Sequence, residues 1–455
     1  MPIKMEFSKQ IFYTIESGAP ALLVHVDMRQ LWHNGFKQQA LLTKLALNIN
    51  FLSIFPFPVI SLLSFAVTTA CVASSGNTQA NKHVIEESAF TEFSYGEKGY
   101  QYASADGNNF LWFGVRLQTR YSNSSIQEDL LPNDPINSDS DFEVNRGRLK
   151  FGGHLFIPEF TVYSEYDFTS NTLLDLRASY EFTDWLNIRI GQWKSQFNRE
   201  RSDSSGAQQF AERSIVTPWF TIDRQKAFLA SGRFGEGKQY DSSYWFGWLS
   251  GAGRGGDLSD ANGMWLGRYQ WNFSGRVLAF SQSDINKRDK AAGSAAVSLI
   301  NGESQYTSFS STGGGQLPGF TDGESDQYNI EQALFETAWQ SHGFSWQQEL
   351  HWKTIDDRVS KLKRKLSGGY AQTGMFFSEV WKQWPEPLEL AIRLAHVDMD
   401  RSISGDYERE NTLVANWFFN GHRNKLTVDL SYVKRKMAPE TDTNIRYRIQ
   451  WDVSF

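Results

Sequence analysis

The segment Ile445-Arg-Tyr-Arg-Ile-Gln-Trp-Asp-Val-Ser-Phe455 alternates apolar and polar residues over its whole length. Successive side chains of an extended strand point to opposite faces, so one face of this segment is entirely apolar and the other polar. A tilted strand of about 9–11 residues is long enough to cross the hydrocarbon layer of a membrane. The segment is therefore typical of a transmembrane β-barrel. A half-buried edge strand of a soluble β-sandwich is the alternative that the rest of the chain must exclude.

The composition favours the barrel. The chain has 455 residues, of which 40% are hydrophobic, and its mean hydropathy is −0.46, which is too polar for a bundle of membrane helices. A barrel hides half of each strand in a wet lumen and therefore has a polar average. The 16 Trp, 17 Tyr and 34 Phe residues suit the aromatic girdles at two membrane interfaces. The net charge of −6 argues against a nucleic-acid partner.

One apolar run, Phe51–Ala70, resembles the central part of a secretory signal. It follows the basic residues Lys37 and Lys44 and precedes the small residues around Cys71, the single cysteine. A transmembrane anchor and lipidation of Cys71 are the alternatives. Because the preceding segment is long for a signal, Met28 is a candidate for the true start.

We expect three regions: a presequence at 1–75, a periplasmic segment at 76–108, and a barrel at 109–455. Alternation and turn residues predict about sixteen strands in the last region. The expected strands are Phe110–Tyr121, Phe142–Leu155, Phe160–Phe168, Leu173–Glu181, Leu186–Trp193, Lys226–Phe234, Ser243–Ser250, Gly263–Phe273, Gly275–Asp284, Gln327–Trp339, Phe344–Lys353, Gly369–Phe377, Pro387–Val397, Asn411–Phe419, Asn424–Val433 and the final segment.

The connections between these strands alternate in length. Those after even-numbered strands are short, including the link around Ser274, whereas most after odd-numbered strands are long, including Lys194–Gln225 and Ile285–Asp326. Single-chain bacterial barrels have short periplasmic turns and long extracellular loops, and a soluble sandwich has no reason for such sorting. The predicted fold class is therefore all-β: a transmembrane antiparallel β-barrel of about sixteen strands with long extracellular loops and an infolded third loop.

Basic residues gather on the second strand and in the third long connection. Arg146, Arg148 and Lys150 share the polar face of one strand, and Arg116 lies on the polar face of the first. Basic groups in a narrow pore attract anions and repel cations. A solvated surface loop with nearly balanced charge is the alternative for the third connection. The candidate pore-lining residues are Arg116, Arg146, Arg148, Lys150, Lys194, Arg199, Arg201, Arg213 and Arg224.

No catalytic or cofactor-binding motif in the sequence lies next to the secondary structure that such a motif requires. Gly251-Ala-Gly-Arg-Gly-Gly256 spells a dinucleotide-binding fingerprint, but a further strand follows it instead of a helix, so an exposed Gly-rich loop is expected. No phosphate-binding loop, nucleophile elbow or metal-ligand spacing is present in the sequence. We therefore expect no cofactor, no metal, no catalytic residues and no enzymatic activity.

Several motifs together resemble the phosphate-selective porin O and P family over roughly Gly99 to Phe455. They are Arg146-Gly-Arg-Leu-Lys-Phe151, Phe182-Thr-Asp-Trp185, Arg189-Ile-Gly-Gln-Trp-Lys194 with Phe197, Arg199 and Glu200, Leu388-Glu-Leu-Ala-Ile-Arg393, and Asn416-Trp-Phe. The resemblance implies a sixteen-stranded barrel in the outer membrane of a Gram-negative cell, usually a homotrimer, that passes small anions by diffusion past Arg and Lys side chains.

This resemblance also implies partners. They are outer-membrane lipid and lipopolysaccharide, small anionic solutes with phosphate and polyphosphate as candidates, and the barrel-assembly machinery, for which Phe455 resembles the signal. A non-selective general porin is the alternative function, and an outer-membrane barrel with an enzymatic or adhesion role is a further one.

Overall fold

The computed structural model describes residues 92–124, 140–256, 263–310, 313–324, 326–437 and 439–455. The predicted presequence at 1–75, with Cys71 and Met28, and the first part of the predicted segment 76–108 lie outside these residues. Within the described part of the chain, no helix has the length and apolar character needed to cross a membrane.

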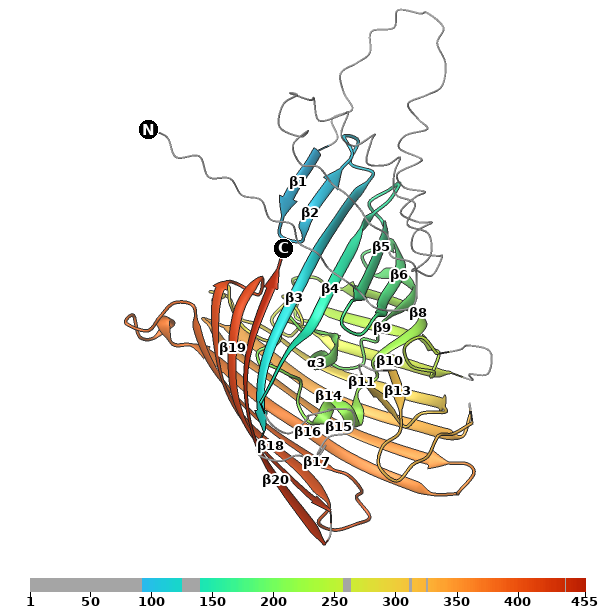
Figure 1. Cartoon of the computed structure of the whole chain (residues 1–455). Coiled ribbons are helices and arrows are strands. Elements are labelled where there is room, and N and C mark those ends of the chain that lie inside the picture. Colours follow the sequence, from blue (N-terminus) through green and yellow to red (C-terminus); the bar gives the residue numbers. More distant parts are fainter. Residues whose placement is uncertain (1–91, 125–139, 257–262, 311–312, 325, 438) are drawn as a thin grey trace, which may run out of the picture. The chain divides into compact units, whose positions relative to one another are not determined.

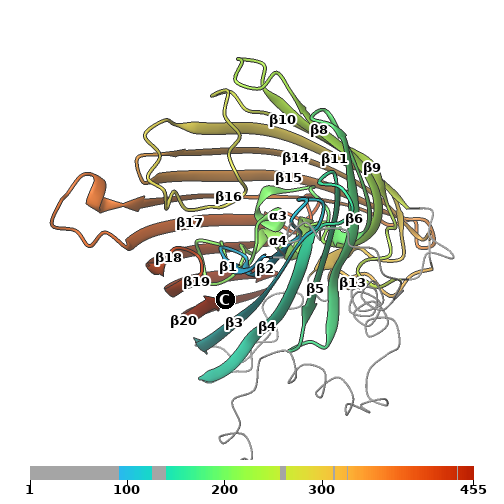
Figure 2. The ribbon, with the colours of Figure 1, turned by 90° about the horizontal axis from the view of Figure 1, so that it is seen from above.

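The described residues form a closed antiparallel barrel (Figures 1 and 2). Of the 18 strands in the main sheet of the described residues, the first two form a hairpin, and the other sixteen pair in chain order. The ring closes because the last strand pairs with the first, Val453 opposite Leu117. The predicted fold class is confirmed. The hairpin strands are β1 (Glu92–Gly96) and β2 (Gly99–Ala103).

Consecutive barrel strands are joined by loops that are mostly long at one end and short at the other. The strands are β3 (Phe110–Ser124), β4 (Asp141–His154), β5 (Phe160–Asp167), β6 (Thr172–Thr183), β7 (Leu186–Lys194), β8 (Arg224–Phe234), β9 (Ser242–Leu249), β10 (Met264–Trp271), β11 (Ala292–Ser304), β14 (Tyr328–Ser341), β15 (Phe344–Asp357), β16 (Lys363–Phe376), β17 (Leu388–Asp398), β18 (Tyr407–Asn420), β19 (Asn424–Met437) and β20 (Glu440–Ser454).

The alternation of β20 separates the two faces of the wall. Tyr447 and Trp451 are exposed on the outside, whereas Arg448 and Asp452 point inward and are buried. The inward charges are paired, because Arg448 contacts Asp429 of the neighbouring strand at 2.8 Å. An apolar outer face can therefore contact lipid while the polar face lines the lumen, as expected for membrane barrels.

The predicted ninth strand, Gly275–Asp284, is wrong. The ninth barrel strand is β11, which lies in the region predicted as a long loop, Ile285–Asp326. Small side chains such as Ser294 and Ala296 face inward on β11, so the strand lacks the strong polar and apolar contrast that marks the others. The link around Ser274 is consequently long and not short, as residues 272–291 connect β10 to β11.

Residues 272–291, called here the inner segment, contact groups inside the barrel. Gln282 accepts a hydrogen bond from the Gln209 backbone N–H at 2.8 Å, and Ser283 donates to Glu389 at 2.9 Å. Leu278 is 2% exposed and packs with Ala292. The inner segment therefore fills part of the lumen at the short-turn end.

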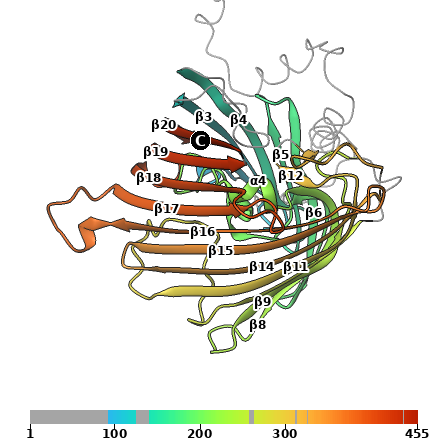
Figure 3. The same ribbon diagram turned by 90° about the horizontal axis from the view of Figure 1, so that it is seen from below.

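The third long connection, residues 195–223 and called here loop 3, folds into the ring, as predicted. Figure 2 shows its two short helices, α3 (Arg199–Ser202) and α4 (Val216–Phe220), surrounded by strands, and Figure 3 shows α4 there from the opposite side. Trp219 and Phe220 are buried in an apolar cluster with inward residues of one side of the wall, among them Leu334, Ile355, Leu366 and Val397. Loop 3 thus rests on β14 to β17.

In the long connection before β14, β12 (Ser308–Ser310) and β13 (Gly313–Gly315) form a small hairpin that contacts α4. The hairpin lies at the long-loop end of the barrel and packs on α4. Together, the hairpin and loop 3 fill this side of the lumen.

Candidate functional site

A cavity of about 280 Å³ lies between loop 3 and the wall formed by β4 to β8. Its lining combines inward-facing residues of β4 to β8 with loop 3 and two loops of the long-loop end. The lining residues are Asn145, Arg146, Arg148, Asp167, Thr169, Ser170, Thr172, Leu174, Lys194, Arg201, Ser205, Arg213, Arg224 and Arg254.

Two wall arginines are held by carboxylates of neighbouring strands. Arg148 donates from Nη1 to Glu165 at 2.8 Å and from Nε to Asp167 at 2.7 Å. Arg224 donates from Nε to Asp175 at 2.5 Å. Charge-assisted hydrogen bonds of this kind fix the orientation of a guanidinium group, so these two cations have defined positions.

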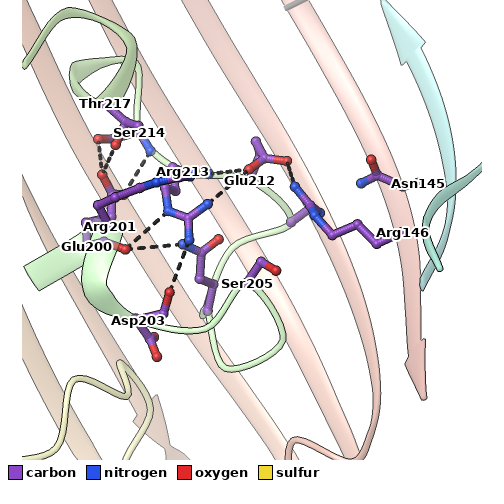
Figure 4. A network of polar contacts seen from close by, with 12 residues as sticks. Asn145, Arg146, Glu200, Arg201, Asp203, Ser205, Glu212, Arg213, Ser214 and Thr217 are labelled. Atoms are coloured by element: carbon purple, nitrogen blue, oxygen red, sulfur yellow. Dashed lines mark hydrogen bonds and ion pairs between the residues drawn. The ribbon is translucent and has the colours of Figure 1, made fainter. Parts of the chain in front are cut away.

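Loop 3 supplies two further arginines. Arg201 donates from Nε to Asp223 at 2.5 Å. Arg213 donates to two backbone carbonyl groups, those of Glu200 at 3.2 Å and Asp203 at 3.1 Å (Figure 4). A carboxylate is more distant, because Nη1 of Arg213 lies 4.0 Å from a carboxylate oxygen of Glu212, so the charge of Arg213 is compensated less closely than that of Arg201.

The side chain of Glu212 connects loop 3 to the wall. Its Oε2 atom lies 3.1 Å from Nη2 of Arg146 and 3.0 Å from Nη2 of Arg120. Figure 4 shows the Glu212 side chain between Arg213 and Arg146. Although burial raises the pKa of Glu212, the charges of Arg146 and Arg120 hold that pKa well below its ordinary value. Glu212 therefore stays ionised and ties the loop to β4.

Lys194, at the end of β7, donates from Nζ to the backbone carbonyl of Asp203 at 2.7 Å. Burial raises the pKa of the Asp203 carboxyl group to about 6, against the lowering effect of the Lys194 and Arg213 charges. Burial and the charge of the neighbouring Arg201 together lower the pKa of Arg213 to about 9. Asp203 can therefore change its charge within the physiological pH range.

The charges are arranged in two layers. Seven lining residues of the described part of the chain are cationic, and Asp167 is the one carboxylate among them. The other carboxylates, such as Glu165 and Asp175, lie behind the arginines they bind. A permeating ion in the cavity consequently meets the cationic groups first.

Six of the nine predicted pore-lining residues meet in this cavity: Arg146, Arg148, Lys194, Arg201, Arg213 and Arg224. Arg116, Arg199 and Lys150 do not line it. Arg116 is buried in an ion pair with Asp452 and donates to Ser205 at 2.7 Å behind the cavity. Lys150 lies opposite Glu165 across the β4–β5 pair.

Arg199 is on the far side of loop 3. Its backbone N–H donates to Glu336 at 2.9 Å, and its Nε donates to Gln347 at 3.2 Å. The next residue, Glu200, donates its backbone N–H to Glu349 at 2.6 Å. These carboxylates face the first turn of α3, so Arg199 belongs to the anchorage of loop 3 on the wall and not to the cavity.

Among the cations of the cavity in the described residues, Arg254 is the one that the sequence did not predict. It lies in the Gly-rich segment Gly251–Gly256, which was expected to be exposed, but its first three residues are buried. Gly253 has φ +70° and donates its N–H to Gln225 at 3.0 Å, and a Cβ there would lie 2.6 Å from the Gly314 nitrogen. The glycines therefore let this loop pack closely and direct Arg254 toward the cavity.

A family model, phosphate-selective porin O and P, matches residues 113–450. The chain belongs to the phosphate-selective porin O and P family. The resemblance seen in the sequence is thereby confirmed, and the chain is an outer-membrane porin. No curated protein matches the chain.

Solved structures with similar folds are described as an outer-membrane protein, a porin and an outer-membrane channel. OmpTdeltaL8, a loop L8 deletion mutant of OmpT from Vibrio cholerae, matches with a TM-score of 0.50 at 9% identity, over 76% of this chain and 100% of that chain. An anion-selective porin from Comamonas acidovorans matches with a TM-score of 0.49 at 10% identity, over 76% and 99%. The channel DcaP of Acinetobacter baumannii matches with a TM-score of 0.49 at 10% identity, over 76% and 98%. At these identities the likeness concerns the fold alone.

Proposed function

We propose that this porin passes small anions by diffusion and that the cavity between loop 3 and β4 to β8 is its filter. The observation that carries the proposal is the excess of cationic groups on the cavity surface, seven against one carboxylate in the described residues. A cationic constriction lowers the energy of an anion and raises that of a cation.

Oxyanions such as phosphate suit this lining. Guanidinium groups present paired N–H donors that match two oxygens of a phosphate or carboxylate. Arg148 and Arg224 already share part of their donors with carboxylates, which weakens each contact with a passing ion. Several weak sites in succession let an ion enter and leave again, as conduction requires.

A non-selective general porin is the second candidate, and the carboxylate layer favours it. Glu165, Asp175, Glu212 and Asp223 offset much of the cationic charge at a distance of one side chain. Screening by salt weakens the remaining field further. The two candidates therefore differ in the strength of selectivity and not in the path.

We also propose that the porin forms a homotrimer and is exported with a signal peptide. The barrel closure at β20 supports a contribution of Phe455 to assembly, because its N–H donates to the Val115 carbonyl at 2.9 Å and its carbonyl accepts from the Val115 N–H at 2.6 Å.

The test is competition between anions in a planar bilayer. Phosphate added to a chloride solution should reduce the chloride current of the wild-type porin, since both ions use the same cationic groups. The current of the variant Arg213→Gln should be less sensitive to phosphate. A chloride current that phosphate leaves unchanged would contradict the oxyanion site and leave only the general porin.

A further inference from the structure

The outer wall of the barrel carries a groove of about 360 Å³ near the long-loop end. It crosses β11, β14, β15 and β16, on the face opposite to the lumen. Leu299 and Trp352 border it and are 61% and 43% exposed. A groove on this face opens toward the membrane and not toward the pore.

Strand register divides the groove into two rows. In the row nearer the middle of the barrel wall, Leu299 pairs with Ala333 and Ala333 pairs with Trp352. The small Ala333 side chain lies between two large neighbours, so it forms the floor of a depression. The next row toward the middle continues with Val297, Phe335 and Leu350, which are also exposed apolar residues.

The row nearer the long loops is polar. Glu331 pairs with Thr354, and Thr354 pairs with Lys365. The backbone N–H of Arg401 donates to the Lys365 carbonyl at 2.8 Å, so a second cation lies beside the first. The groove therefore joins an apolar floor to two cations that lie nearer the long loops than the floor does.

The two cations differ from their neighbours in their pairing. Lys363 lies 3.6 Å from Asp356, and Arg364 lies 3.4 Å from Asp400. In the described part of the chain, no ion pair involves Lys365 or Arg401. Glu331 is the acidic residue of the groove, and it lies two strands away from Lys365.

Further cations follow on the same face. Arg409 pairs with Lys434, which places two cations abreast on β18 and β19, and Arg409 donates from Nε to Nδ1 of His396 on β17 at 3.4 Å. Like charges directly opposite each other destabilise a sheet unless an anion lies between them. Arg409 and Lys434 therefore extend the basic character of the outer face from β16 to β19.

We propose that the groove binds a lipopolysaccharide molecule of the outer leaflet: an acyl chain lies over Ala333 between Leu299 and Trp352, and a phosphate of the lipid contacts Lys365 and Arg401. Two features specify this occupant. The apolar track runs into the membrane-facing surface, which suits an acyl chain, and the cations stand at its headgroup end, which suits a phosphate.

The test measures binding of purified porin to hexa-acylated lipid A by native mass spectrometry in a neutral detergent. The double variant Lys365→Gln/Arg401→Gln should bind lipid A about 25-fold more weakly than the wild type. Each cation near a membrane surface raises the affinity for an anionic lipid by about fivefold. Ala333→Trp fills the floor and should abolish binding. Lys363→Gln is the matched control, because it removes a neighbouring outward cation that has its own carboxylate partner, and it should bind like the wild type.

Lipid A without its phosphates should bind the wild type as weakly as lipid A binds the double variant. Equal binding of phosphorylated and dephosphorylated lipid A would overturn the proposal. So would tighter binding of phosphatidylglycerol than of lipid A, or a double variant with a changed oligomeric state and unchanged lipid binding. Chloride conductance should be unaffected in all of these variants, which separates this site from the filter.

Discussion

Removal of the Lys194 and Arg254 charges is expected to reduce anion selectivity without loss of the barrel. Both side chains line the cavity. The Asp203 carbonyl that Lys194 contacts also accepts a hydrogen bond from Arg213, so Lys194→Met leaves no buried acceptor unpaired. Arg254→Gln keeps a polar side chain at the cavity surface. The variants therefore change mainly the electrostatic potential.

The cavity size sets the magnitude. A sphere with the cavity's volume of 280 Å³ has a radius of about 4 Å, so an ion at its centre lies about 6 Å from the charged wall atoms. At that distance one unit charge changes the energy of a monovalent ion by about 0.7 kcal/mol in bulk water and by about 3 kcal/mol near a protein surface. An energy change of about 1 kcal/mol corresponds to about a fivefold change in how readily the ion enters the cavity. We expect each substitution to lower the Cl⁻/K⁺ permeability ratio by about fivefold or more.

The assay is the reversal potential in a KCl gradient across a planar bilayer, at about 0.1 M salt, where screening acts over about 10 Å. Lys363→Gln is the control, because Lys363 is an exposed cation on the outer wall. An unchanged reversal potential in a well-assembled double variant would show that these cations do not control the path of the ion.

Three further outcomes follow from the same contacts. Lowering the pH from 7 to 5 protonates Asp203, whose pKa is about 6, and removes a negative charge beside Lys194. The preference for anions, measured as a reversal potential, should therefore rise. The variant Asp203→Asn should abolish most of that rise. Arg148→Glu brings a third carboxylate between two others and should sharply reduce the yield of folded barrel in a heat-modifiability assay, since a broken buried pair costs about 3–5 kcal/mol, whereas Arg148→Gln should be milder. Deletion of Phe455 removes two backbone hydrogen bonds at the closure of the barrel and should lower the yield of heat-modifiable trimer; a normal trimer yield would refute this.

The strands with strong contrast between their two faces could be predicted from the sequence. In β4, Leu149 and Phe151 are exposed outside while Arg148 and Lys150 face inward, as the alternation indicates. This contrast exists because the two faces meet different solvents, lipid and water. The inward direction of Arg146 and Arg148 followed from the same periodicity.

The errors lie where that contrast is absent. On β11, small residues face a lumen that loop 3 and the inner segment already fill, so the inward positions need neither charge nor bulk. The inner segment contains Leu278, which is buried against the wall, and its local pattern therefore resembled a strand.

Long-range pairing decided which basic residues share the cavity. Arg199 follows the same basic pattern as Arg201, but Glu336 and Glu349 of distant strands hold the backbone of α3 and direct Arg199 away. Arg254 could have been found only from the position of its loop, which begins at the same barrel end as loop 3. Neither feature has a local signal in the sequence.

The most direct test of the central claim is the sign of the reversal potential of the wild-type porin. Purified protein in a planar bilayer with a tenfold KCl gradient should show a potential of the sign set by chloride, because the cationic lining of the cavity favours anions. A potential of the sign set by potassium would contradict the account.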